Sequence, residues 1–333
     1  MVLYIKRSGF IMDNFFIKLQ DANYSLLEKY FSTHWEKPVY SYSPLWVFRE
    51  VFILKQKYKH LNLQISVDLK VDESLTPIIC IREDEKIIEY QFIAPRNEKM
   101  FLDFYQRNNI PLSTKLVVLS PAFIPSNNNL FKLIKTNKQM IYDCASFTKG
   151  IEMDLEECTC TIIKEKSSRY ALRKNLKECS YRSVEQDDAP YIQQVLNQWT
   201  KSNSARNKSP ADVDKDLFTI PWAVNIHNNE LLAFIGFRGT LPISYSFVVR
   251  LLGSHNYASH MIAKSLNYKS VAGGYNETSV WELYQCCKAC LKSGIEYLNA
   301  NGYSSNLSLK KFKERFAIKD LEFETYDWVL VHS

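Results

Sequence analysis

Apolar residues recur with two different periods in the first 150 residues, and the period predicts the element. Spacings of three and four residues predict helices over 24–31, 44–59 and 97–108, and an Asn-rich start predicts another over 127–138. Alternation of apolar and polar residues with many β-branched side chains predicts strands. These strands cover residues 61–68, 76–83, 86–93 and 115–120, with a short extended segment at 141–147.

The second half of the chain repeats this mixture of helices and strands. Its pattern predicts a linker over 149–160 and helices over 164–182 and 187–199. Two strands on either side of a turn at 227–229, and a third over 242–252, predict an antiparallel meander. Residues 257–266 are expected to be helical, and residues 321–331 are expected to form a strand that returns beside the core of this second unit.

The clearest helix lies near the C-terminus, after the turn that Gly273-Gly274 predicts. Ser279 and Glu282 have the spacing of a capping box, which predicts the start of the helix. The apolar face predicted from helical spacing comprises Val280, Leu283, Cys287, Cys290, Leu291 and Gly294. The residues expected to point away from it are Glu282, Gln285, Lys288 and Lys292. A short strand over 295–299 follows, and then an amphipathic helix over 309–316 with Leu309, Phe312 and Phe316 on one side.

This succession is similar to the end of the tandem GNAT-type acyltransferases. The likeness covers Lys292 to Phe316 and depends on the K-x-G at the helix end, the Asn-rich turn and the motif L-x-x-F-K-x-x-F. It resembles most the Fem peptidoglycan aminoacyltransferases and the C-terminal domain of phosphatidylglycerol lysyltransferases. The resemblance implies an α/β fold of two tandem GNAT-like units with mixed central sheets. We expect an N-terminal unit over 1–150 and a C-terminal unit over 151–333 with the probable active cleft.

Composition agrees with a globular protein and excludes several other classes. Of the 333 residues, 46% are hydrophobic, and the formal net charge is +6, which is only mildly basic. The sequence contains no apolar run of the roughly 20 residues that a transmembrane helix needs. The N-terminus lacks the apolar core of a signal peptide, so the expected location is the cytoplasm. Either Met1 or Met12 could be the true start.

The eight cysteines predict packing and not metal binding. Cys158-x-Cys160 and Cys286-Cys287-x-x-Cys290 do not form the two C-x-x-C pairs of a zinc site. Two of these thiols lie on the apolar face of the predicted helix. Free cysteines often pack as small hydrophobes in a reducing compartment. No metal is therefore expected.

A basic helix over 164–182 is the expected entry to the second unit. The two families carry a similar R-x-x-L-R-K helix here, and the resemblance implies a face that binds the phosphates of CoA, tRNA or a nucleotide-linked acceptor. An ordinary solvated charged helix is the alternative. The candidate phosphate-binding residues are Arg169, Arg173, Lys174 and Lys177.

Candidate catalytic residues are few. Neither G-x-S-x-G nor H-E-x-x-H occurs, so no hydrolase or metalloprotease motif is present. By resemblance to the Fem enzymes, Lys313 would lie in the active site and stabilise an oxyanion or contact a phosphate; a plain surface lysine is the alternative. His255 and His260, near a predicted strand end, are candidates for proton transfer, with a merely solvated histidine as the alternative, and Glu277 is a candidate base. Tyr245, Tyr275 and Asn276 are expected to line the same cleft.

The sequence leaves the donor open. Acetyl-CoA-dependent GNAT enzymes carry a glycine-rich loop after the fourth strand, and we expect the corresponding position to be 251–261, which keeps Gly253 but lacks a second glycine. That absence favours aminoacyl-tRNA over acyl-CoA as co-substrate, with no permanently bound cofactor. The acceptor would be a small molecule, a lipid or a peptide. The alternatives are a non-catalytic GNAT-like binding or scaffold protein and a conventional acyl-CoA N-acyltransferase with an unusual loop.

Overall fold

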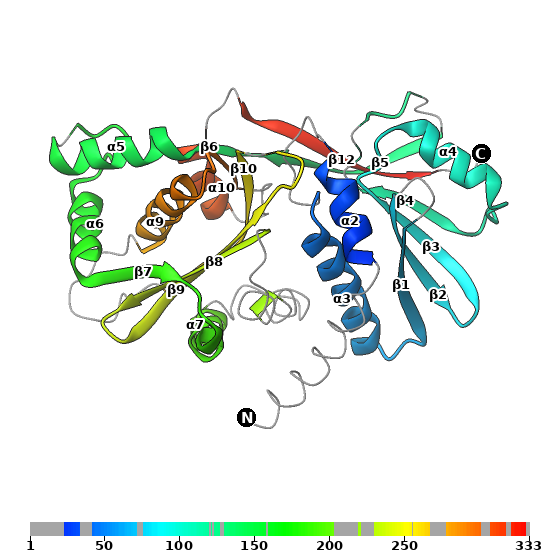
Figure 1. Ribbon diagram of the computed structural model, residues 1–333, viewed down its shortest axis with the longest axis horizontal. Coiled ribbons are helices and arrows are strands. Elements are labelled where there is room, and N and C mark those ends of the chain that lie inside the picture. Colours follow the sequence, from blue (N-terminus) through cyan, green and yellow to red (C-terminus); the bar gives the residue numbers. More distant parts are fainter. Residues whose placement is uncertain are drawn as a thin grey trace.

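A computed structural model gives the fold of the chain in two halves, each built on a six-stranded mixed sheet (Figure 1). It describes residues 23–33, 42–71, 76–119, 121, 123–126, 130–157, 159–202, 219–220, 230–254, 256–266, 278–300, 307–317 and 321–330. In this part of the chain no helix is long and apolar enough to cross a membrane.

The first sheet has the strand order β1-β2-β3-β4-β12-β5. Neighbours in it run antiparallel except β3 and β4, which are parallel. The strands are β1 (Ile65–Val71), β2 (Pro77–Glu83), β3 (Lys86–Ile93), β4 (Lys115–Leu119), β5 (Phe131–Gln139) and β12 (Phe323–Leu330).

Alternation along β2 sends side chains to two different cores, one on each face of the first sheet. Ile78 and Cys80 pack with Phe101 of helix α4 (Glu98–Arg107). Ile79 and Ile81 instead join the core under α2 (Asn23–Ser32) and α3 (Pro44–His60). The predicted helices at 24–31 and 44–59 are therefore confirmed, and so is the helix at 97–108.

The second sheet has the order β6-β11-β10-β9-β8-β7. Its strands β7 to β10 form an antiparallel meander, whereas β11 runs parallel to β10 and antiparallel to β6. Of the three strands predicted for a meander, β8 and β9 match the second and third, and the first, before the turn at 227–229, lies outside the described residues. The strands are β6 (Ile141–Asp143), β7 (Cys179–Ser183), β8 (Leu231–Arg238), β9 (Leu241–Arg250), β10 (Tyr257–Ser265) and β11 (Tyr297–Asn299).

Helices cover both faces of the second sheet. Helix α9 (Thr278–Lys292) packs on one face together with α5 (Cys144–Glu156), α6 (Lys166–Glu178) and α10 (Leu307–Phe316). Helix α7 (Ala189–Ser202) packs on the other face, and its Ile192 and Val195 join the core that also holds α2 and α3. That core therefore continues from one half of the molecule to the other.

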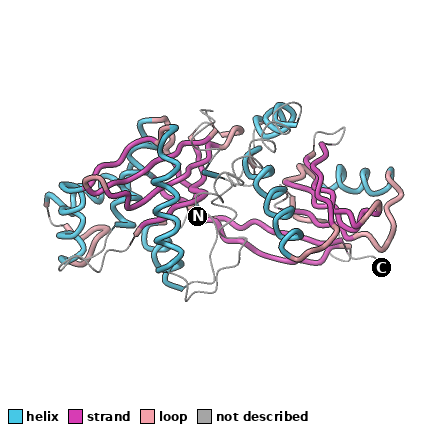
Figure 2. Tube along the Cα trace, turned by 90° about the horizontal axis from the view of Figure 1, so that it is seen from below, coloured by secondary structure: helices cyan, strands magenta, loops and turns pink. Residues whose placement is uncertain are grey.

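The two sheets exchange strands (Figure 2). Strand β5 belongs to the first sheet, yet after Met140 the chain continues as β6 in the second. In the opposite direction, β12 leaves the second half and pairs with β4 and β5. The expectation that residues 321–331 return beside the second core is wrong, because their backbone partners lie in the first sheet. The proposed division at residue 150 stays a prediction.

Three other local predictions are also wrong. Residues 127–138 were expected to be helical, but 131–139 form strand β5, which pairs along its whole length with β12. Residues 257–266 form β10, held between β9 and β11, because sheet pairing overrides a weak helical pattern. The expected linker at 149–160 is mostly helix α5, whose first turn is capped by the Asp143 side chain, which accepts a hydrogen bond from Ser146 N at 2.8 Å.

A buried carboxylate lies between the two halves. Glu230, directly before β8, accepts hydrogen bonds from Tyr24 Oη at 2.7 Å and Leu45 N at 3.1 Å. Burial raises the pKa of Glu230 to about 7. The carboxyl group thus joins the second sheet to the first turn of α3.

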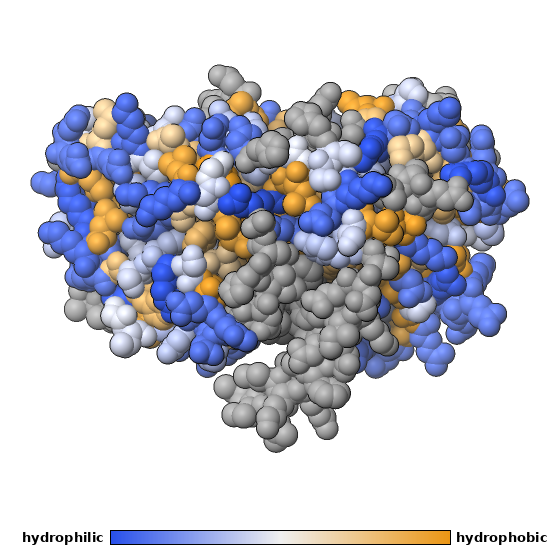
Figure 3. Space-filling model, viewed as in Figure 1, coloured by the Kyte–Doolittle hydropathy of each residue, from blue (hydrophilic) through white to orange (hydrophobic). Residues whose placement is uncertain are grey.

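The face of the molecule seen in Figure 3 mixes apolar residues among hydrophilic ones.

Candidate functional site

Lys313 is placed by the aromatic side of helix α10. The Phe316 ring is buried and lies 5.1 Å from the Phe147 ring of α5 and 5.2 Å from the Phe312 ring. This packing directs Lys313 inward, where its Nζ donates a hydrogen bond of 2.6 Å to Ala300 O, just after β11. Burial lowers the pKa of Lys313 to about 8. The surface-lysine alternative therefore does not describe this residue.

Lys313 reaches the place where strands β10 and β11 part. Their parallel pairing covers only 257–259 against 297–299, after which β11 ends and β10 continues to Ser265. The register of β10 with β9 also shifts between His260 and Ile262, which marks a β-bulge. Bulges redirect side chains and are frequent beside functional sites.

His260 at this bulge is a neutral imidazole whose side chain is 10% exposed. Its Nε2 lies 3.1 Å from Ser246 Oγ of β9 and 3.7 Å from Glu282 Oε1 of α9. Burial and the nearby charge of Lys313 lower the pKa of His260 to about 4. At neutral pH the ring carries no charge, so it can accept a proton or donate electron density to a ligand.

Glu282 was expected to face away from the core, and this is wrong. The side chain is 4% exposed, because α9 packs against α5 and α6 as well as against the sheet. Burial raises the pKa of Glu282 to about 8, although interaction with the Tyr181 hydroxyl partly opposes the shift. Its Oε1 has no hydrogen bond within the described part of the chain.

The predicted capping box at the start of α9 is not formed. The helix already includes Thr278, so Ser279 lies inside its first turn, and the Ser279 hydroxyl is 2.6 Å from Ser265 Oγ of β10. Glu282 instead shares a helical stripe with Thr278, Cys286 and Cys290, at intervals of four residues. That spacing was the signal that could have revealed its burial.

The Ser246–His260–Glu282 group is not a hydrolytic triad. In such a triad the serine and the carboxylate contact different nitrogens of the imidazole, so that one nitrogen takes a proton while the other is held. Here both oxygens face the same atom, Nε2. Sequence reasoning had singled out His260 as a candidate for proton transfer, but it had not pointed to Ser246, Glu282 or Tyr181. The arrangement of these residues calls for a chemistry different from that of a triad.

The cysteines of α9 are buried in the core, as predicted for Cys287 and Cys290. Cys286 is buried as well and lies beside Glu282 and His260. A hydrogen bond with Cys290 lowers the pKa of Cys286, but burial and the nearby Glu282 raise it, and the resulting pKa is about 11. The thiol is therefore protonated at neutral pH unless a ligand displaces its proton.

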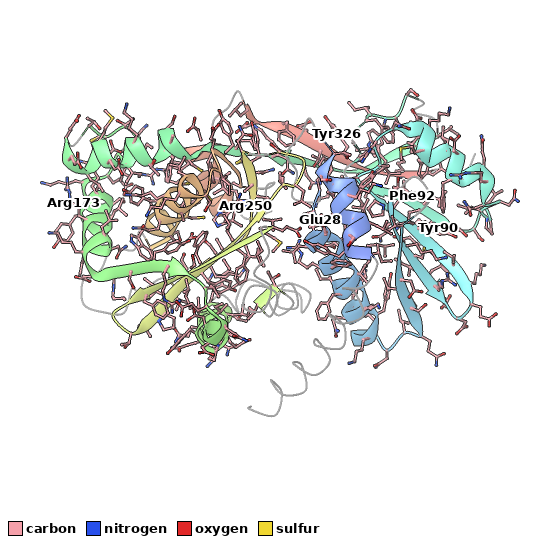
Figure 4. All side chains as sticks on the ribbon, viewed as in Figure 1. Glu28, Tyr90, Phe92, Arg173, Arg250 and Tyr326 are labelled. Carbon is pink, nitrogen blue, oxygen red and sulfur yellow. The ribbon has the colours of Figure 1, made fainter. Side chains whose placement is uncertain are left out.

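Two arginines of the basic helix α6 make internal contacts. Arg169 Nη1 donates to Ile163 O at 2.6 Å and Lys164 O at 3.0 Å, and the side chain is buried. Arg173, at the outer edge of the molecule, donates from Nε to Leu155 O at 3.1 Å (Figure 4). These bonds hold the segment between α5 and α6, so both arginines have structural partners.

The two lysines of α6 are more open to a ligand. Lys174 Nζ lies 3.9 Å from the Glu178 carboxylate one turn along the helix, and exposed pairs of this kind contribute little stability. Lys177 is exposed. Phosphate binding by Arg169, Arg173, Lys174 and Lys177 stays a prediction. Because both arginines already bond to backbone carbonyls, the two lysines are the better candidates for phosphate binding.

The other predicted site residues do not gather around Lys313. Tyr245 is buried in the core that joins the two halves, with its ring centroid 5.2 Å from that of Phe247. This core lies on the sheet face opposite α9. His255, Tyr275, Asn276 and Glu277 lie outside the described residues, and their predicted roles stay untested.

The predicted position of the donor loop is wrong. Residues 251–256 connect β9 to β10, the third and fourth strands of the second unit's meander, so they precede the fourth strand. The segment after that strand runs from residue 266 to the start of α9 and contains Gly273-Gly274, most of it outside the described residues. The missing second glycine near Gly253 therefore gives no reason to prefer aminoacyl-tRNA over acyl-CoA.

Comparison with known proteins supports the fold. No family model matches the sequence, and no curated protein matches it. Three solved structures align with most of the chain. L-PGS from Bacillus licheniformis has a TM-score of 0.51 and 9% identity, covering 79% of this chain and 83% of its own. FemX has a TM-score of 0.50 and 9% identity, covering 85% and 91%.

The third structure is the C-terminal domain of a putative lysylphosphatidylglycerol synthetase from Agrobacterium fabrum. Its TM-score is 0.50 at 12% identity, covering 80% of this chain and 84% of the domain. The chain has the tandem GNAT fold. The resemblance predicted from residues 292–316 is thereby confirmed. At such identities the likeness concerns the fold alone and specifies neither an activity nor a donor or acceptor.

Proposed function

We propose that this chain transfers an acyl or aminoacyl group from an activated donor to an amine or hydroxyl acceptor. The observation that carries the proposal is the position of Lys313. Its amine is directed into the second unit, bonded to Ala300 O where β10 and β11 part, beside the bulge at His260. A positive charge held at such a place can stabilise an oxyanion.

The reaction would proceed by direct attack. The acceptor nitrogen or oxygen forms a bond to the activated carbonyl carbon, and the carbonyl oxygen gains negative charge. The bond to the leaving group then breaks, and the proton lost by the acceptor passes to that leaving group. With a pKa of about 8, Lys313 is mostly an ammonium ion at pH 7, so its charge is available to the developing oxyanion. The protein otherwise contributes positioning.

The donor is a co-substrate and not a resident cofactor in this proposal. Both aminoacyl-tRNA and acyl-CoA carry phosphates, and the exposed lysines of α6, Lys174 and Lys177, suit either. The acceptor is a small molecule, a lipid or a peptide bearing an amine or hydroxyl group. Mass spectrometry of ligands that copurify with the chain would separate the donors, because only CoA yields pantetheine fragments.

Activity with defined donors provides the decisive test. Purified protein would be incubated with labelled aminoacyl-tRNAs and with acyl-CoAs, together with amine, peptide or phospholipid acceptors, and transfer of label would be measured. Lys313→Ala should reduce turnover roughly 10²- to 10³-fold, as for loss of one oxyanion donor. Lys292→Ala, an exposed lysine on α9, is the matched control and should retain activity.

A non-catalytic binding role is the competing function. It would be favoured if a donor bound tightly but no label moved to any acceptor, or if Lys313→Ala left transfer at the wild-type rate. Lys313→Arg helps to separate the two cases, because it keeps a positive charge but not the lowered pKa. Partial activity in this variant would indicate that charge at this position is what the reaction uses.

A further inference from the structure

Three different metal-ligating side chains meet beneath the sheet of the second unit. One ligand atom from each of His260, Glu282 and Cys286 lies within 4.8 Å of the other two, the only such group of three among the residues described. Glu282 and Cys286 are one turn apart on α9, and His260 faces them from β10. We propose that these three side chains bind one divalent cation of the zinc class.

The ligand set suits zinc chemically. Zinc is held by imidazole nitrogen and carboxylate oxygen at about 2.0–2.2 Å and by thiolate sulfur at about 2.3 Å, in tetrahedral geometry. In a tetrahedral site those bond lengths place nitrogen and oxygen ligands roughly 3.3–3.6 Å apart and the sulfur roughly 3.5–3.7 Å from either. The His260–Glu282 distance of 3.7 Å is close to this spacing. The 4.8 Å that bounds the cluster requires a contraction of at most roughly 1.3 Å, which side-chain rotations can supply.

Charge balance also favours a cation here. A buried site tolerates little net charge. The two positive charges of the ion would be neutralised by the Glu282 carboxylate and the Cys286 thiolate, while His260 stays neutral, as its environment already dictates. Without an ion, Glu282 Oε1 has no hydrogen-bond partner among the described residues. Binding would therefore satisfy a buried oxygen that the fold otherwise leaves unpaired.

The surroundings supply one further ligand and one opposing charge. Ser246 Oγ lies 3.1 Å from His260 Nε2. The Ser246 hydroxyl, or a water bonded to it, is therefore near enough to serve as the fourth ligand. Lys313 acts in the opposite direction, because its charge already lowers the pKa of His260 and would repel a cation. Removing that charge should strengthen metal binding, whereas loss of a ligand should weaken it.

Metal content of the full-length protein is the first measurement. The chain would be purified without added metal, equilibrated with zinc, passed over a desalting column and analysed by elemental mass spectrometry. We expect one zinc per chain. Cobalt substitution should add the near-ultraviolet band of thiolate-to-cobalt charge transfer, which only a cysteine ligand produces. A wild-type protein that retains no zinc and shows no such band would overturn the proposal.

Substitutions then assign the ligands. Cys286→Ser, Glu282→Gln and His260→Gln should each abolish stoichiometric binding, and Cys286→Ser should remove the cobalt band. Cys287→Ser is the matched control, since Cys287 is the adjacent buried thiol on α9 but is not a member of the cluster. Full binding by the Cys286→Ser variant, or equal loss in Cys287→Ser and Cys286→Ser, would refute the assignment.

Two readouts separate binding from damage to the fold. Circular dichroism would confirm that each variant is folded before its metal content is compared. Lys313→Met should bind zinc more tightly than wild type, which a nonspecific loss of structure cannot produce, and weaker binding would contradict the geometry. None of these measurements uses acyl transfer, so the metal site and the proposed reaction can fail independently.

Discussion

Replacement of Glu282 by glutamine would test whether the buried carboxyl group controls the pH dependence of stability. In the folded protein its pKa is raised from 4.5 to about 8. The folded state therefore retains a proton that the unfolded state releases between these two values. The resulting stability is fully present below pH 4.5 and is lost as the pH rises toward 8.

The size of this effect follows from the pKa shift. One pKa unit corresponds to about 1.4 kcal/mol, so the stability contributed by Glu282 should fall by roughly 3–4 kcal/mol between pH 5 and pH 8. Glutamine resembles the neutral carboxylic acid in shape but does not titrate. The difference in unfolding free energy, wild type minus Glu282→Gln, should therefore become more negative by that amount over the same interval. Glu230, also buried, titrates in both proteins and cancels in the difference.

Urea unfolding at several pH values, with a chelator present, would measure this difference. The chelator matters because a bound cation would keep Glu282 ionised and suppress the slope. Glu156→Gln, an exposed position on α5, is the control and should give a difference that does not change with pH. If wild type and Glu282→Gln respond to pH in parallel, Glu282 does not titrate in the way its burial implies.

Three further predictions follow from packing and charge. Gly236→Ala should destabilise by about 1–3 kcal/mol in urea unfolding, because a Cβ there would lie 2.8 Å from the buried Trp281 ring; an unchanged midpoint would contradict this. Phe316→Ala should cost roughly 3–5 kcal/mol, and the less buried Phe312→Ala should cost less; the reverse order would place the anchor of α10 elsewhere. Turnover should decline above about pH 8 as Lys313 loses its proton, and Lys313→Arg should move that decline upward.

The sequence predicted best those parts of the fold whose local signals agree with their tertiary environment. Helix α3 begins at Pro44, as predicted, and Ser43 caps it by accepting a hydrogen bond from Trp46 N at 3.2 Å. Strand β3 has the predicted bounds, because the alternation along 86–93 agrees with its pairing to β2 on one side and β4 on the other. Lys313 was singled out through a resemblance; the structure directs its amine toward Ala300 O, and its role in an active site stays a prediction.

The errors arose where distant partners decide the structure. Residues 131–139 carry many lysines and alternate only weakly, and β12, about 190 residues later, makes them a strand. Nothing local shows that the last strand crosses to the other sheet. Glu282 was misplaced because a charged residue at a helix surface was assumed to face water, whereas α9 is enclosed on several sides. His260 was hidden inside a segment predicted to be a helix.

The burial of Glu282, His260 and Cys286 is itself an argument about function. Relative to an apolar pair of the same size, a carboxylic acid with a pKa near 8 opposes folding at neutral pH, and an imidazole with a pKa near 4 opposes it as the pH falls below about 6.5. A core formed only for stability would favour the apolar pair. This cost in folding stability falls where β10 and β11 part and where the Lys313 side chain lies. Groups whose pKa values are shifted in opposite directions are typical of ligand-binding and catalytic sites. The proposed cation would bind the same three side chains, Glu282, His260 and Cys286. The pH dependence of stability and the metal content therefore report on the same group of residues.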